Sequence, residues 1–336
     1  MIKITEPKII QKFSRQKSQI FNFDAREFRS KNFTKNYLQD RKKLFKRYKK
    51  FILTKKKPCP FCGCKKANEY LQLEHNYILY ECQKCFLIFP NIDINGIHEF
   101  EEKEVKSHNH YVTNRKTHRA TSAYRVNSFG VYKIEYLKKY AGLNSKKKVL
   151  DFGCGSGNFL SVLKHFKYNY IGFDPDISDI NLCKEQKLNA VSNLTEIKGK
   201  FDIITLYDVL EHVIDINKTI SLISKKLKRK GKIVIYVPNI HSSSFDLMGK
   251  YQNHTYPFEH FNFFSEKTIQ ILSKKNHLKI NRIEYNGLDL IDYFLLKEFV
   301  DKKKYYEPFK EFINYAQSIL DKHNLSNSMR VILSKV

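Results

Sequence analysis

A glycine-rich loop follows a short apolar run near the middle of the chain. Three glycines occupy alternate positions in it: Gly153, Gly155 and Gly157. Glycine lets the backbone turn sharply and approach a ligand closely, because it carries no Cβ. Asp174 ends the next apolar run, 23 positions after Asp151, and a carboxylate there can accept hydrogen bonds from both hydroxyls of a ribose. Together the two features predict a site for a nucleotide-type cofactor.

The spacing of the glycines argues against NAD as that cofactor. In the dinucleotide fingerprint, the third glycine comes three positions after the second. Here Gly157 comes two positions after Gly155, and Asn158 stands where the third glycine would be. Hydride chemistry with a nicotinamide is therefore not expected.

Four of the seven cysteines form two Cys-x-x-Cys pairs separated by 19 residues: Cys59, Cys62, Cys82 and Cys85. Four thiolates at this spacing can meet as a closed tetrahedral zinc site. Because four protein ligands leave no open position, the pattern predicts a structural Zn²⁺ rather than a catalytic one. Cys64 is a less well placed substitute ligand. A module of this size has no core of its own, so the metal would supply its folding energy.

Three polar side chains after the apolar run 201–206 share a helical spacing. Asp208, Glu211 and His212 stand at i, i+3 and i+4, so they lie on one face if the turn is helical. His212 can then accept a proton from a substrate hydroxyl, because its unperturbed pKa lies near neutrality. Two alternatives remain open: all three residues bind a divalent cation that acidifies the hydroxyl, or Glu211 and His212 only satisfy nearby backbone groups.

His260 is a second candidate base. It lies in an aromatic-rich segment that runs from Phe258 to Ser265. The alternative is structural: Phe263 and Phe264 enter the core, and Ser265 caps a helix that begins at the next residue. We expect the cap.

The motifs resemble those of the Rossmann-like S-adenosylmethionine-dependent methyltransferases. The glycine loop matches their first motif, Asp-x-Gly-x-Gly-x-Gly, and residues 201–213 resemble the fourth-strand block of ubiquinone-type O-methyltransferases. Those enzymes have Glu where Asp208 stands. Residues 230–239 resemble the fifth strand, so the likeness covers roughly residues 147–285 in the right order. Residues 80–91 are similar to the second knuckle of a zinc ribbon that precedes some bacterial methyltransferases of surface-sugar and metabolite pathways.

The resemblance implies roles for the individual residues. Asp151 would fix the loop and face the amino group of S-adenosylmethionine, whose methionine part would border the three loop glycines. Asp174 would bind the ribose hydroxyls, with Asp176 its competitor for the role of helix cap. Asn193 is the candidate for the adenine, and Asp208 belongs to the same cofactor-binding set.

The implied activity is methyl transfer to a small metabolite or glycan precursor, at oxygen, or else at carbon or nitrogen. The second interpretation is an RNA methyltransferase, although the Asn/Asp-Pro-Pro-aromatic motif of amino-group methylases does not follow the fourth strand. The third is an interaction protein that has kept the fold and lost the activity. The intact glycine loop and Asp174 argue against the third.

The positive charge of the chain is concentrated at its N-terminus. Residues 1–57 contain 19 Lys or Arg against 4 Asp or Glu, within a total net charge of +27. The apolar spacing of residues 36–52, at positions 38, 45, 48 and 52, predicts an amphipathic helix. Its cations and aromatic rings can bind nucleic acid or contact anionic lipid, or the rings can simply pack on the body. We favour packing.

The pattern from residue 147 onward predicts an α/β fold. Strand-like runs alternate with helical ones, as in a doubly wound parallel sheet. The resemblance implies seven strands with an antiparallel last strand, which residues 329–336 would supply. The expected parts are a basic helical arm (1–57), a zinc ribbon (58–95), a helical lead-in (96–145) and the methyltransferase domain (146–336) with a helical insertion at about 288–324. We expect that insertion to pack rather than to line a pocket or touch a membrane.

The sequence contains no apolar run long enough to span a membrane and no signal-peptide core at Met1. Together with cysteines that suit a metal better than disulfides, this predicts a cytoplasmic protein.

Overall fold

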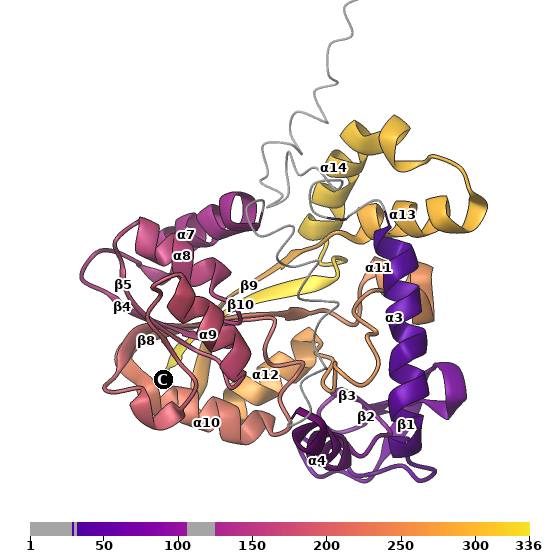
Figure 1. Ribbon diagram of the computed structural model, residues 1–336, viewed down its shortest axis with the longest axis horizontal. Coiled ribbons are helices and arrows are strands. Elements are labelled where there is room, and N and C mark those ends of the chain that lie inside the picture. Colours follow the sequence, from indigo (N-terminus) through magenta and orange to yellow (C-terminus); the bar gives the residue numbers. More distant parts are fainter. Residues whose placement is uncertain (1–28, 30–31, 106–124) are drawn as a thin grey trace, which may run out of the picture.

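A seven-stranded sheet with helices on both faces forms the centre of the computed structural model, which describes residues 29, 32–105 and 125–336 (Figure 1). Its strands are β4 (Lys148–Phe152), β5 (Asn169–Phe173), β6 (Ala190–Val191), β7 (Phe201–Tyr207), β8 (Leu227–Pro238), β9 (Leu278–Asn286) and β10 (Ser328–Lys335). The strands lie in the order β6-β5-β4-β7-β8-β10-β9. β10 runs antiparallel to both of its neighbours. The predicted fold class is confirmed.

The strand order reverses between β4 and β7, and this reversal positions the site. From β4 the chain proceeds outward to β5 and β6, then returns to β7 on the other side of β4. The loops that leave β4 and β7 therefore meet at the carboxyl edge of the sheet beside this reversal, which is where open α/β sheets bind ligands.

Helices cover both faces because the strands are apolar on both. Leu150 and Ile204 face the side of α10 (Ile216–Lys226) and α12 (Glu266–Lys275). Val149 and Ile203, each one residue earlier, face the opposite side. Three helices cover that side: α7 (Val131–Tyr136), α8 (Asn158–His165) and α9 (Ile177–Glu185). This alternation of adjacent residues between two cores is expected for a parallel sheet buried on both faces.

The fifth strand is longer than the sequence indicated. The resemblance placed it within residues 230–239, whereas β8 begins at Leu227. Leu227 is fully buried and pairs with Phe201, and the register shifts beyond that pair. Its side chain also fills the space beside Gly231. Because Leu227 is buried, β8 begins at this residue and includes the Lys-rich stretch that follows it.

A second, three-stranded antiparallel sheet carries the cysteine pairs. It comprises β1 (Ala67–Gln72), β2 (Ile78–Cys82) and β3 (Ile88–Pro90). Phe61, Leu87 and Phe89 of this module share a buried cluster with the large sheet. Ile88 exchanges two backbone hydrogen bonds with Phe263, of 3.1 and 2.9 Å. The small sheet is thus packed on the large domain.

The helical lead-in is described in part. α4 (Ile94–Val105) follows the small sheet, and the π-helical turns η3 (Arg125–Gly130) and η4 (Leu137–Ala141) flank α7. The remainder of the predicted lead-in, 106–124, lies outside the described residues. Gly142 ends this segment with φ of +70°, the left-handed conformation expected of a glycine stop. Single 3₁₀ turns occur at η1 (Lys49–Phe51), η2 (Glu74–Asn76), η5 (Leu194–Glu196) and η6 (Gly249–Tyr251).

The predicted insertion between β9 and β10 is a pair of helices, α13 (Asp289–Asp301) and α14 (Tyr306–Lys322). Ile291, Leu295 and Ile313 form a small core of their own there. Phe309 and Phe312 of α14 remain about half exposed, so packing accounts for only part of the apolar surface. A short helix, α11 (Ser243–Met248), lies next to α13. None of the helices in the described ranges has the length and apolarity to cross a membrane.

The N-terminal helix α3 (Phe33–Tyr48) packs lengthwise on the body (Figure 1). The predicted helix exists, but its buried stripe differs from the predicted one of positions 38, 45, 48 and 52. It consists of Tyr37, Arg41, Phe45 and Tyr48. A basic residue can occupy this stripe because its head group finds acceptors inside. The described aromatics of α3 therefore pack, whereas residues 1–28 and 30–31 of the predicted arm lie outside the described residues.

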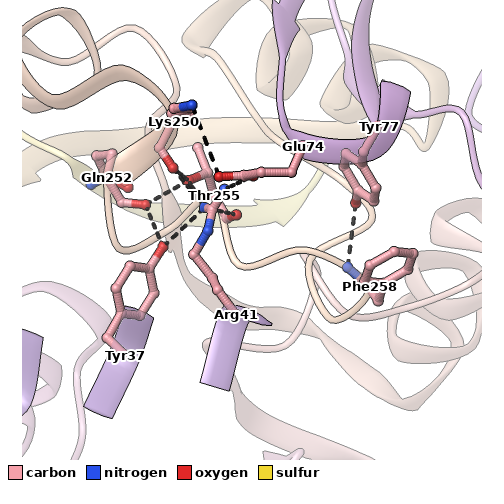
Figure 2. A network of polar contacts seen from close by, with 8 residues as sticks. All are labelled: Tyr37, Arg41, Glu74, Tyr77, Lys250, Gln252, Thr255 and Phe258. Carbon is pink, nitrogen blue, oxygen red and sulfur yellow. Dashed lines mark hydrogen bonds and ion pairs between the residues drawn. The ribbon is translucent and has the colours of Figure 1, made fainter. Parts of the chain in front are cut away.

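Arg41 joins three parts of the chain in one polar network (Figure 2). Its guanidinium donates to the carbonyl oxygen of Lys250 at 2.6 Å and pairs with Glu74 at 2.6 Å. Tyr37 donates to the carbonyl oxygen of Gln252 at 3.0 Å. Arg41 is only 3% exposed, so these acceptors compensate for the removal of its charge from water.

We expect Arg41→Met to destabilise the protein by about 2–4 kcal/mol, because it leaves buried carbonyl groups without their donor. The midpoint of thermal unfolding should fall, and amide hydrogen exchange in α3 should accelerate. The neighbouring exposed Lys42→Met is the matched control and should change neither. Equal unfolding midpoints for the two variants would contradict the assignment.

Candidate functional site

Four cysteine sulfurs come together at one end of the small sheet. The Sγ atoms of Cys59, Cys62, Cys82 and Cys85 all lie within 4.8 Å of one another. The contacts from Cys59 to Cys85 and from Cys62 to Cys82 are both 3.4 Å. Zinc–sulfur bonds of about 2.3 Å in a tetrahedron would place sulfurs about 3.8 Å apart, so the set fits a zinc ion after a small adjustment.

The two Cys-x-x-Cys turns have matching backbones. The residue after each pair adopts a left-handed conformation, with φ of +71° at Gly63 and +59° at Phe86. Each turn is closed by a backbone hydrogen bond to the carbonyl oxygen of its first cysteine, from Gly63 to Cys59 and from Phe86 to Cys82, both 2.9 Å. A hydrogen bond from Cys85 lowers the pKa of Cys59 to about 6, which favours a thiolate at this position. Cys64 lies outside the cluster and contacts the carbonyl oxygen of Lys66.

The glycine loop leaves β4 and is fixed beside the end of β5. All three glycines have positive φ, at +80° for Gly153, +51° for Gly155 and +87° for Gly157. A Cβ at the first or the third would meet Val209 or Leu188 at 2.4 Å, whereas one at Gly155 would meet nothing closer than 4.0 Å. The outer glycines thus permit tight packing, and the middle one borders open space.

Asp174 holds the loop at this open position. One carboxylate oxygen accepts from the backbone N–H of Gly155 at 2.9 Å, and the other accepts from that of Asp176 at 2.9 Å. A carboxylate oxygen can accept more than one hydrogen bond. Asp176 is the N-cap of α9, where it accepts from the N–H of Ser178 at 2.8 Å. The cap role therefore belongs to Asp176, and Asp174 faces the loop.

Asp151 is buried at the end of β4, where Thr205 donates to it at 2.6 Å. Burial raises the pKa of Asp151 to about 6. The positive charge of Lys133 in α7 acts against that rise, and its Nζ lies 3.9 Å from the centre of the Tyr207 ring. Lys133 could not be predicted as a site residue from the sequence, because no motif surrounds it. It comes near Asp151 only when α7 covers the carboxyl edge of the sheet.

Asn193 lies after β6, where its side chain accepts from the N–H of Thr195 at 2.9 Å and caps η5. Asp208 follows β7 in the left-handed conformation, with φ of +58°, which Asp tolerates better than most residues. Its N–H donates to the carbonyl oxygen of Tyr236 at 3.0 Å.

The two candidate bases lie side by side. The rings of His212 and His260 are 4.6 Å apart at an interplanar angle of 84°. Ligand atoms of Glu211, His212 and His260 all lie within 4.8 Å of one another, and Asp208 is not part of this group. The carbonyl oxygen of Glu211 accepts from the N–H groups of Phe261 and Asn262, at 2.7 and 3.1 Å, which brings the segment of His260 to the end of β7.

Hydrogen bonds fix the ring nitrogens of both histidines. Nδ1 of His212 contacts the carbonyl oxygen of Glu259, and Nδ1 of His260 contacts that of His254, both at 2.9 Å. Because a carbonyl oxygen only accepts, each Nδ1 carries the proton, and each neutral ring presents a lone pair on Nε2. Burial, together with His212 and His254, lowers the pKa of His260 well below its usual range, which keeps this ring neutral.

Glu211 is only 1% exposed, and one of its carboxylate oxygens has no hydrogen-bond partner. Burial, followed by the charge of Asp208, raises its pKa well above the usual range. Beside this group, Phe263 and Phe264 are buried, and Ser265 accepts from the N–H of Thr268 as the N-cap of α12. The predicted helix cap is confirmed.

Comparison with known proteins finds a match over the part of the chain that carries the glycine loop and the histidine pair. The family model for a methyltransferase domain matches residues 126–281. A ubiquinone biosynthesis O-methyltransferase of Pelagibacter ubique is 28% identical over 160 residues, or 43% of this chain and 67% of that protein. That of Bradyrhizobium diazoefficiens is 29% identical over 110 residues, or 30% of this chain and 43% of that protein. The chain spans about half the length of the curated relatives it matches.

Among solved structures, the crystal structure of a SAM dependent methyltransferase from Archaeoglobus fulgidus is similar, with a TM-score of 0.44 and 22% identity. The alignment covers 62% of this chain and 94% of that one.

We expect purified protein to contain about one zinc ion per chain, and Cys82→Ser to lose it, because three ligands bind zinc far less well than four. Metal content is measured by plasma mass spectrometry. Cys64→Ser is the matched control, since Cys64 lies outside the cluster, and it should retain the metal. Loss of zinc from the Cys64 variant alone would show that the ligand set is wrong.

Proposed function

The chain carries a methyltransferase domain of the S-adenosylmethionine-dependent class, and from this premise we propose that the protein transfers a methyl group to a small metabolite or glycan precursor, at oxygen. The observation that carries the proposal is the link between Asp174 and the N–H of Gly155 at the reversal of the sheet. A carboxylate and an open backbone surface thus lie together at the carboxyl edge of the sheet, and this supports the proposal of a nucleotide-type cofactor there.

The residues at this edge suit the parts of S-adenosylmethionine. Asp174 would accept hydrogen bonds from the ribose hydroxyls, because a carboxylate oxygen can accept more than one. The open side of Gly155 would border the methionine part, between Gly153 and Gly157. Asp151 would face the amino group, and Asn193 would lie beside the adenine. We add Lys133, whose cation above Tyr207 suits the carboxylate of the methionine.

The cofactor supplies a methyl group that is already activated by its sulfonium. The protein has therefore mainly to align the acceptor in line with that methyl group and to exclude water. Asp208 directly follows β7 and is proposed to line the cofactor side. One of the two histidines, His212 or His260, would take the proton of the acceptor hydroxyl on its Nε2.

A divalent cation is the alternative use of the same residues. Glu211, His212 and His260 offer one carboxylate oxygen and two imidazole nitrogens, a mixed ligand set that divalent metals bind. The sequence proposed Asp208 in this set, and the geometry favours His260 in its place. A cation there would favour the ionised form of Glu211 and acidify a bound hydroxyl.

The choice of oxygen rests on the relatives that are named O-methyltransferases. RNA remains the second acceptor class. The main argument for RNA is the basic, aromatic N-terminal arm. In α3 this argument is weaker, because Tyr37, Phe45 and Tyr48 are buried against the body and are not available to stack on bases. We likewise propose that the four clustered cysteines hold a structural zinc ion.

Asp174→Ala should weaken S-adenosylmethionine binding about a hundredfold, because the ribose loses two charge-assisted hydrogen bonds and the loop loses its anchor. Calorimetric titration measures the affinity. Asp176→Ala is the matched control: it removes a carboxylate two residues away, costs about 1 kcal/mol of helix capping, and should leave the affinity unchanged. Unchanged affinity in Asp174→Ala would remove this residue from the site.

The acceptor class can be identified by incubating the wild-type protein and its cofactor with a panel of phenols, nucleotide sugars and RNA. The release of S-adenosylhomocysteine is the measurement. With an accepted substrate, His260→Ala should lower the rate about 10²–10⁴-fold while leaving cofactor affinity unchanged, as expected on removal of a general base. His323→Ala, which alters an exposed histidine at the end of α14, is the control. Full activity in both His260→Ala and His212→Ala would exclude the pair.

A further inference from the structure

A row of polar side chains crosses the large sheet beside the proposed site. Tyr207 of β7 lies opposite Tyr236 of β8, and Tyr236 lies opposite Arg330 of β10. Side chains directly opposite each other on neighbouring strands point to the same face. That face is covered by the stretch from α7 to η4, which contributes Tyr132, Tyr136 and Tyr140 at helical spacing. An arginine is thus enclosed by tyrosines on two sides.

Arg330 is buried among aromatic rings. It is 5% exposed, and its guanidinium carbon lies 4.2, 5.0 and 5.5 Å from the ring centres of Tyr136, Tyr132 and Tyr236. Its Nε and Nη1 atoms have no hydrogen-bond partner. In the described part of the chain, no carboxylate forms an ion pair with it. Ring faces stabilise a cation, but they do not satisfy the N–H groups of a guanidinium.

The unsatisfied groups around Arg330 are donors as well. The hydroxyls of Tyr136 and Tyr207 and the amide nitrogen of Asn286 are buried and have no partner within hydrogen-bond distance, although the carboxylate of Glu284 is near enough to Tyr136 to contribute to the rise of its pKa. Burial raises the pKa of Tyr132 to about 12 and that of the other phenols further, so all of them keep their protons. The carbonyl oxygen of the Asn286 side chain is already used by the hydroxyl of Tyr236, at 3.1 Å. The cluster thus presents several N–H and O–H donors, and the acceptors among its unpaired groups are neutral phenol oxygens.

The acidic residue opposite Arg330 forms an ion pair with a different arginine. Glu284 of β9 lies opposite Arg330 on its other side, but it pairs with Arg282. Arg282 in turn stacks on Tyr140, 4.1 Å from its ring centre. A buried cation surrounded by unpaired donors is costly unless an anion completes it.

The location of the cluster indicates which molecule would bring the anion. Arg330 lies near the start of β10, and because that strand is antiparallel, its start lies at the carboxyl edge of the parallel strands. At about 4.8 Å per strand, Arg330 is about 14 Å from β4 and its glycine loop, and about 10 Å from β7, where the candidate bases begin. The acceptor side of the site is therefore the nearer one.

We propose that Arg330, with Tyr136, Tyr207 and Asn286, binds an anionic group of the methyl acceptor, a carboxylate or a phosphate. This inference rests on the proposed methyltransferase function and names the chemical class of its substrate. The guanidinium fork matches either oxyanion in two parallel hydrogen bonds, and the phenols supply the remaining donors. The tyrosine rings would enclose an apolar or aromatic part adjacent to the anion.

The test uses the full-length protein saturated with S-adenosylhomocysteine and four probes: benzoate, phenyl phosphate and their neutral counterparts benzamide and phenol. Binding is measured by thermal shift and calorimetry at constant ionic strength. The anionic probes should bind and the neutral ones should not, and the tighter anion identifies the source as a carboxylate or a phosphate. Arg330→Met should weaken anion binding about ten- to a hundredfold, as expected for the loss of charged hydrogen bonds.

Tyr136→Phe provides a second variant that keeps the cation if Arg330→Met fails to fold, and it should weaken anion binding about two- to tenfold. Arg229→Met, at an exposed position of β8, is the control and should bind both cofactor product and anion normally. Equal anion affinity in wild type, Arg330→Met and Tyr136→Phe would overturn the proposal, as would equal binding of benzamide and benzoate. Failure of the wild type to bind S-adenosylhomocysteine would instead refute the proposed function.

Discussion

The reversal of strand order between β4 and β7 is the constraint on which the proposed site depends. Parallel strands place all their carboxyl ends at one edge, and the reversal sends the helices that follow β4 and β7 to opposite faces of the sheet. The glycine loop precedes the first of these helices, and His212 precedes the second. Asp174, from the end of β5, holds the glycine loop by binding the N–H of Gly155. Donor and acceptor chemistry can therefore be adjacent although their residues come from distant segments.

Two buried arginines show how the same side chain serves different purposes. Arg41 is surrounded by acceptors, namely the carbonyl oxygens of Lys250 and Thr255 and the carboxylate of Glu74. Its charge is satisfied, so it fastens α3 to the body. Arg330 is surrounded by donors and ring faces instead. Burial alone thus does not separate a structural cation from a binding one; the hydrogen-bond capacity of its neighbours does.

The features that could be predicted from sequence are those that depend on local chemistry. The glycine spacing, Asp174 and the cysteine pairs each act within a few residues of a turn, and apolar runs identify the strands and helices around them. The features that were missed depend on register and packing. Arg330 meets Tyr236 only because β10 inserts between β8 and β9 with one particular pairing. Arg41 lies in the buried stripe of α3, although a basic residue was expected on the polar face. It is buried because its acceptors come from residues more than 200 positions away.

His260 illustrates the same limit, and it also links the two sheets. In the sequence it stands in the aromatic-rich segment from Phe258 to Ser265, 48 residues from His212. The structure brings the pair together because Phe261 and Asn262 donate to the carbonyl oxygen of Glu211. One residue further, Phe263 exchanges backbone hydrogen bonds with Ile88 of the small sheet. The segment that carries His260 is therefore held between the end of β7 and the cysteine module. A zinc ion that stabilises the module would also fix the position of this imidazole, so the metal can influence methyl transfer without contacting either substrate.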